Sequence, residues 1–138
     1  MRIGALIRLL LFLILVLPSL LFADDVDIDV HQLKQMMGED VVVIDVRTPG
    51  EWSKTGIVEG SVPIMFFDEK RKPLAEEWMV QAAEYISPNE KVILICRTGN
   101  RSGVIGKYLV KHHGYQDVYN VKGGIVAWKK AGYKTISP

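Results

Sequence analysis

The sequence has very little cysteine: Cys96 is the single cysteine among 138 residues. One thiol cannot form a disulfide within its own chain, so small folds held together by internal disulfides are excluded. The thiol must therefore be buried, paired with another chain, or used in chemistry. The surroundings of Cys96 decide between these possibilities.

The chain also lacks a large excess of charge of either sign. It contains 17 lysines and arginines against 16 aspartates and glutamates, for a formal net charge of +1. If the amino-terminal apolar segment described below is removed, Arg2 and Arg8 are lost with it, and the count becomes 15 against 16, a net charge of −1. This balance favours neither nucleic acid nor an anionic membrane surface as a partner. The three histidines have no cysteine or carboxylate at ligand spacing, so we expect no metal site, and no cofactor is indicated.

A long apolar run occurs at the amino terminus, in MRIGALIRLLLFLILVLPSLLFADD. It has a basic start, an apolar centre and a small residue, Ala23, before two aspartates, which is the pattern of a secretory signal. From Leu9 to Ala23 there are 15 residues, whereas a membrane span needs about 20. We expect a cleaved signal at residues 1–23, a mature domain at residues 24–138, and an exported, periplasmic or secreted protein. An uncleaved segment that anchors the chain in a membrane is the alternative.

Strand and helix patterns alternate along the mature chain. VVVIDV and KVILI are continuous apolar runs, as in strands buried on both faces of a parallel sheet. Alternation with amphipathic segments predicts an α/β fold, a sandwich with a mostly parallel central sheet flanked by helices. The expected strands or extended segments cover 26–29, 41–46, 61–67, 91–95 and 116–121, and the expected helices 30–37, 51–54, 74–86, 102–113 and 124–131.

Cys96 lies at the carboxyl end of a predicted central strand, directly before a helix. Ligands of open α/β sheets bind at this edge. The loop that follows, Arg97-Thr98-Gly99-Asn100-Arg101, can turn backbone N–H groups inward because Gly99 and Asn100 tolerate unusual dihedrals. A helix beginning at Ser102 adds the positive end of its dipole. Together these features favour the nucleophilic thiolate and predict a nucleophile within an anion-binding loop. The alternative is a small buried cysteine that serves packing alone.

Four segments of the chain, taken in order, resemble the rhodanese family of sulfurtransferases. They are the lead-in strand and helix, VVVIDVRTPGEWSKTGIVEGSVPI, the loop CRTGNRS, and GYQDVYNVKGGIVAW, and the resemblance covers residues 26–134. The loop resembles the family's Cys-Arg-x-Gly-x-Arg motif, and the last segment its Gly-Gly-x-x-Ala-Trp ending. One departure is Gly56-Ile57-Val58, where the family often has Gly-His-Ile. That change concerns local packing or partner choice more than the nucleophile.

The resemblance implies a three-layer rhodanese-like domain that catalyses a double displacement. Cys96 would take sulfane sulfur from a small anionic donor such as thiosulfate, form a persulfide, and pass the sulfur to cyanide or a thiol, with a protein acceptor also possible. From their positions in the sequence, we expect Asp45 and Arg47, at the end of a neighbouring strand, to hydrogen-bond loops and each other, or to face the same crevice as Cys96. We expect Glu51 to pair with Arg47 or to cap a short helix. The residues expected to hold the substrate are Arg97, Thr98, Gly99, Asn100, Arg101 and Ser102. The alternative for Arg101 is that it braces the loop through backbone carbonyls.

Two other functions remain open at the level of sequence. The domain could dock a partner or carry sulfur only within a complex, with no turnover of small donors. It could also be a cysteine phosphatase or arsenate reductase, but phosphatases of this fold place five residues between cysteine and arginine. Here four residues separate Cys96 from Arg101. The shorter loop suits a single persulfide sulfur better than a tetrahedral phosphate.

Overall fold

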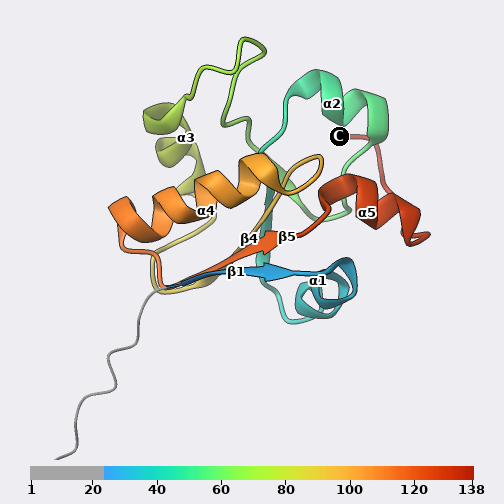
Figure 1. Ribbon diagram of the computed structural model, residues 1–138, viewed down its shortest axis with the longest axis horizontal. Coiled ribbons are helices and arrows are strands. Elements are labelled where there is room, and N and C mark those ends of the chain that lie inside the picture. The colour runs from blue at the N-terminus through green and yellow to red at the C-terminus, as the bar shows by residue number, and fades with distance from the viewer. Residues whose placement is uncertain (1–23) are drawn as a thin grey trace, which may run out of the picture.

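A computed structural model describes residues 24–138, which fold around one parallel sheet (Figure 1). The sheet has five strands in the order β1-β5-β4-β2-β3, and every neighbouring pair runs parallel. Residues 1–23 lie outside the described part, so the signal segment and export stay predictions. The elements are β1 Asp24–Ile28, α1 Val30–Met37, β2 Val42–Asp45, α2 Pro49–Thr55, β3 Val62–Pro63, α3 Ala75–Ala82, β4 Lys91–Ile95, α4 Asn100–His113, β5 Asp117–Val121 and α5 Gly124–Lys130.

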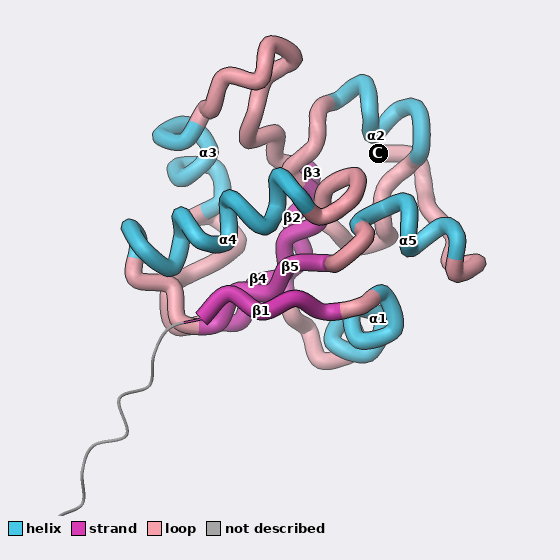
Figure 2. The backbone as a smooth tube through the Cα atoms, viewed as in Figure 1, coloured by secondary structure: helices cyan, strands magenta, loops and turns pink. Residues whose placement is uncertain are grey.

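Helices cover both faces of the sheet, which gives the expected three layers (Figures 1 and 2). The side chains of β4 alternate between two hydrophobic clusters, as the two-residue period of a strand requires. Val92 and Leu94 join the cluster that contains Trp78 of α3. Ile93 and Ile95 join the cluster that contains Trp128 of α5. Because β4 is buried on both faces, the packing of the strand fixes the position of Cys96, which directly follows it.

Most predicted elements are present, with shifted ends. Asp29 caps α1 through a capping box with Gln32. Helix α4 begins at Asn100 and not at the predicted Ser102, because Gly99 takes the left-handed conformation (φ 98°) and serves as the N-cap. The third predicted helix is shorter than expected: α3 ends at Ala82 and tight turns follow. None of the helices in residues 24–138 is both long and apolar enough to cross a lipid bilayer.

Candidate active site

The candidate site lies at the carboxyl edge of the sheet, where three neighbouring strands end. Cys96 follows β4, Arg47 follows β2 after one intervening residue, and Gly123-Gly124 follow β5. These strands are adjacent and parallel, so their carboxyl ends meet at one edge. The edge was predicted from the apolar runs because strands of a parallel α/β sheet point the same way.

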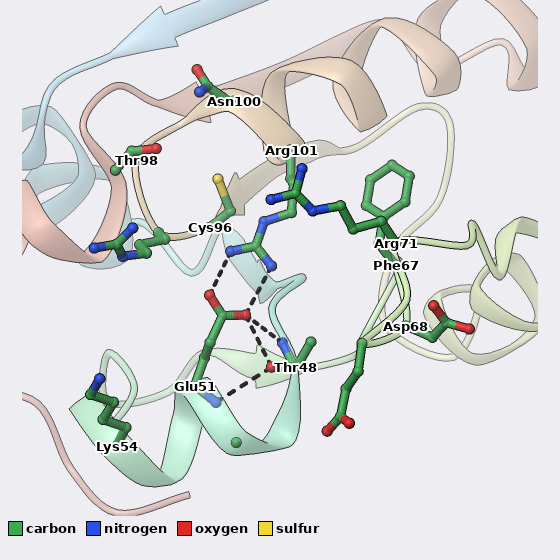
Figure 3. Close-up of a pocket in the computed structure, with 13 residues that line it drawn as sticks. Thr48, Glu51, Lys54, Phe67, Asp68, Arg71, Cys96, Thr98, Asn100 and Arg101 are labelled. Atoms are coloured by element: carbon green, nitrogen blue, oxygen red, sulfur yellow. Dashed lines mark hydrogen bonds and ion pairs between the residues drawn. The ribbon is translucent and has the colours of Figure 1, made fainter.

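The Cys96 sulfur faces hydrogen-bond donors of its own loop and helix. The Gly99 N–H donates to Cys96 Sγ at 3.1 Å. The Ser102 hydroxyl oxygen lies 3.2 Å from the same sulfur. Cys96 is only 1% exposed, yet it lines a cavity of about 720 Å³ (Figure 3). A backbone N–H therefore turns toward the sulfur, and the sulfur borders a space large enough for a small substrate.

The loop residues predicted to hold the substrate divide into two groups. Arg97, Thr98, Asn100 and Arg101 line the cavity with Cys96. Gly99 and Ser102 instead lie against the sulfur, and Ser102 is fully buried. Further lining comes from α2 and from the loop before α3, which the sequence did not indicate: Thr48, Gly50, Glu51, Lys54, Phe67, Asp68, Glu69 and Arg71.

Arg101 forms a bidentate ion pair with Glu51 beneath the loop (Figure 3). Its two terminal nitrogens donate to the Glu51 carboxylate at 2.8 and 2.6 Å. The hydrogen bond from Arg101, with others from Thr48, lowers the pKa of Glu51 from 4.5 to about 2. The same pair raises the pKa of Arg101. The predicted pairing of Glu51 with Arg47 is wrong because α2 carries Glu51 toward α4, whereas the predicted capping role is confirmed by its capping box with Thr48.

The lowered pKa of Glu51 predicts acid-sensitive stability. A carboxyl whose pKa is lower in the folded protein stabilises it fully above its ordinary pKa, and that stabilisation is lost as pH falls. The relevant window therefore runs from pH 4.5 down to about 2. We expect Glu51→Gln to reduce the decline in the free energy of unfolding across this window, measured by urea unfolding at several pH values. Glu77→Gln, on the exposed surface of α3, is the control. An equal decline in wild type and Glu51→Gln would contradict the prediction.

Asp45 and Arg47 form a second ion pair, and neither residue lines the cavity beside Cys96. Both side chains are fully buried, and their closest atoms are 2.7 Å apart. Arg47 also donates to Thr55 Oγ1 at 2.7 Å and to the Gly56 carbonyl at 3.0 Å. Trp52 Nε1 donates to Asp45 at 3.1 Å. The pair therefore ties α2 and the following turn to the end of β2, and it does not touch the sulfur.

The segment after β5 is hydrogen-bonded to the start of the loop that follows β4, which we call the active loop (residues 96–101). This segment was not predicted from the sequence to be part of the site. The N–H of Ile125 donates to the Cys96 carbonyl at 2.9 Å, and that of Val126 to the Arg97 carbonyl at 3.2 Å. Gly124 has a φ of 55°, and a Cβ at this position would overlap the carbonyl oxygen of Cys96. The Gly123-Gly124 pair is recognisable as a motif in the sequence. Its contact with Cys96 joins the ends of two different strands, β5 and β4, and a sequence motif does not indicate such a contact.

A buried nucleophile candidate beside one inward N–H group and two arginines is suited to reaction with a small anion. Comparison with known proteins agrees with this chemistry: the rhodanese-like domain family matches residues 29–131. The chain belongs to the rhodanese-like domain family. Among residues 24–138, no three histidine, cysteine, aspartate or glutamate side chains gather as a metal site would require.

Several relatives of this rhodanese-like chain are named sulfurtransferases, and others are named tRNA uridine(34) hydroxylase. A sulfurtransferase of Allochromatium vinosum is 33% identical over 114 residues, which are 81% of this chain and 95% of the relative. Thiosulfate sulfurtransferase 18 of Arabidopsis thaliana is 30% identical over 107 residues, covering 75% of this chain and 77% of the relative. The solution structure of the polysulfide-sulfur transferase homodimer from Wolinella succinogenes matches with a TM-score of 0.63 at 25% identity, over 84% of this chain and 81% of that one. These likenesses support sulfur transfer in general.

Proposed function

We propose that this protein is a rhodanese-type sulfurtransferase that carries sulfane sulfur on Cys96. The observation that carries the proposal is the Gly99 N–H at 3.1 Å from Cys96 Sγ, beside a cavity lined by Arg97 and Arg101. A donor N–H stabilises a thiolate, and guanidinium groups attract an anionic donor. Thiosulfate is the donor we propose, and cyanide or a thiol is the acceptor.

The reaction proceeds through two displacements at sulfur. In the first, the Cys96 thiolate attacks the outer sulfur of thiosulfate, an S–S bond forms, and the S–S bond within thiosulfate breaks to release sulfite with the electron pair. In the second, cyanide or a thiolate attacks the outer persulfide sulfur. The bond to Sγ breaks and the electron pair returns to Cys96 as thiolate. Neither step changes the total charge, and the enzyme shuttles between two forms, so ping-pong kinetics follow.

The cations of the cavity wall are not equivalent for donor binding. Arg101 is already paired with Glu51, so its charge is largely balanced. Arg97 is exposed and forms no ion pair with another described residue. Lys54 and Arg71 of the cavity wall are also exposed and unpaired among the described residues, but only Arg97 directly follows Cys96 in the chain. We therefore assign the first attraction of the donor to Arg97, with Arg101 holding the loop and the Glu51 carboxylate in place beside it.

Sulfur loading tests the proposal directly. We expect incubation with thiosulfate to add the mass of one sulfur atom to the intact protein, and peptide mapping to place it on Cys96. Cyanide should then remove that mass and yield thiocyanate. A protein that is folded but gains no sulfur at millimolar thiosulfate would contradict donor specificity. If polysulfide loads the same residue, the general sulfurtransferase function still stands.

The burial of Cys96 favours a second candidate function. At 1% exposure the sulfur is accessible only through the cavity, as expected if a partner delivers or removes sulfur inside a complex. In that case the protein is a sulfur-carrying docking module. Steady turnover of thiosulfate and cyanide by the isolated protein would exclude this candidate, and loading without turnover would favour it.

A further inference from the structure

Ser102 places one hydroxyl proton between two acceptors. Its oxygen lies 3.2 Å from Cys96 Sγ and 2.5 Å from Asn120 Oδ1. The Ser102 side chain is fully buried. A hydroxyl has a single proton to donate. It can therefore serve the sulfur or the amide oxygen at one time, but not both.

The orientation of the Asn120 amide is fixed by its other partners. Asn120 Nδ2 donates to Asp27 Oδ1 at 2.9 Å and to the Gly99 carbonyl oxygen at 3.1 Å. Both of these partners are acceptors, so the nitrogen of the amide must face them. The amide oxygen is then directed at Ser102, and Ser102 is its hydrogen-bond donor. Asp27 on β1 and Asn120 on β5 thus control the serine behind the nucleophile.

This arrangement suits a protonated Cys96 better than a thiolate. With its proton on Asn120, the Ser102 oxygen presents a lone pair to Sγ and can accept the S–H of a thiol. A thiolate would instead require the Ser102 proton, and Asn120 Oδ1 would lose its donor. Asn120 is only 7% exposed, and a buried acceptor without a partner is costly. The Gly99 N–H, which favours the thiolate, acts against this effect.

We propose that Asn120 is a positioning residue that competes with Cys96 for the Ser102 proton and so limits the thiolate in the resting protein. This inference takes from the proposed function only that Cys96 is the nucleophile, and its test measures the reactivity of the sulfur without any sulfur donor. None of the charged residues near the sulfur is substituted in that test, although Asp27 loses its hydrogen bond from Asn120. They are Asp27 on β1, Asp45 at the end of β2, Arg47 after it, Glu51 on α2, Arg97 in the loop and Arg101 on α4.

Alkylation of Cys96 by iodoacetamide, which consumes the thiolate, is the measurement. Asn120→Leu keeps a similar side-chain volume and removes the acceptor, so the Ser102 proton becomes free to bond the sulfur. At about pH 6.5, well below the ordinary thiol range, we expect the rate to rise about fivefold, the effect of one gained hydrogen bond. Oxidation by hydrogen peroxide should accelerate in the same ratio.

The effect must pass through Ser102, and a double variant tests this. In a Ser102→Ala background, Asn120→Leu should leave the alkylation rate unchanged from that of Ser102→Ala alone. Tyr119→Leu, at the neighbouring position of β5 within the other cluster, is the control for damage to the strand. Thermal unfolding establishes that each variant is folded, and Asn120→Ala replaces Asn120→Leu if the leucine does not fit.

Three results would overturn the inference. They are a lower or unchanged rate in folded Asn120→Leu, an increase that persists in the Ser102→Ala background, and an equal increase in Tyr119→Leu. Absence of sulfur loading in the wild-type protein, with the alkylation pattern as expected, would instead count against the proposed function and leave the role of Asn120 standing. The two conclusions are therefore tested separately.

Discussion

Cys96→Ser is expected to abolish sulfur loading and sulfur transfer completely. A serine hydroxyl is a far weaker nucleophile than a thiolate, and it cannot form a persulfide. Intact mass after incubation with thiosulfate should show no added sulfur, and thiocyanate formation should fall to the rate without protein. The substitution nearly conserves volume at a buried position, so we expect thermal unfolding to change little by comparison.

A thiol placed elsewhere in the chain tests whether sulfur loading needs the surroundings of Cys96 or only a thiol. Ser53 is exposed on α2 and does not line the cavity. Ser53→Cys in the Cys96→Ser background restores one thiol to the chain, without the Gly99 N–H or the arginines. We expect this variant to remain inactive. Sulfur loading on residue 53 at the wild-type rate would show that the surroundings of Cys96 contribute nothing.

Arg47→Met is expected to destabilise the fold by about 3–5 kcal/mol, the range for breaking a buried ion pair from one side. The substitution leaves Asp45 charged and without its partner, although neither side chain has any contact with solvent. It also removes the hydrogen bonds to Thr55 Oγ1 and to the Gly56 carbonyl. Urea unfolding at neutral pH, followed by tryptophan fluorescence, measures the loss. A decrease in the free energy of unfolding of less than about 1 kcal/mol would mean that Asp45 is not left as an uncompensated buried charge.

The double variant Asp45→Leu with Arg47→Met is the matched control. Replacing both charges by apolar side chains leaves no uncompensated charge inside the protein, so we expect it to be more stable than Arg47→Met alone. Full recovery is not expected, because Trp52 Nε1 and the Gly56 carbonyl also lose partners. A double variant less stable than the single one would show that the hydrogen bonds outweigh the charge.

The position of the nucleophile could be predicted because it depends on local patterns. A continuous apolar run predicts a strand buried on both faces, and β4 alternates between the two clusters as that requires. Since strands of this class run parallel, Cys96 had to lie at the carboxyl edge. The cap of α1 is likewise a local feature, because Asp29 and Gln32 are three residues apart.

The partners of the polar side chains could not be predicted, because they come from distant segments. Arg101 meets Glu51 across 50 positions of sequence, and Asn120 meets Asp27 across 93. Periodic sequence patterns do not indicate which residues so far apart will be in contact. The carboxylates of Glu51 and Asp27 also had several possible partners in the sequence. The start of α4 was placed two residues late because Gly99 was assigned to the loop only. Its left-handed conformation lets the helix begin at once after it.

The hydrogen bonds between the start of α5 and residues 96 and 97 make the segment after β5 part of the candidate active site. Two main-chain bonds join residues 96 and 97 to 125 and 126, and these bonds need no particular side chain at either end. What they need is the absence of a side chain at Gly124. A relative that kept the cysteine loop but gained bulk at this glycine would retain the signature of an enzyme while its sulfur pointed elsewhere.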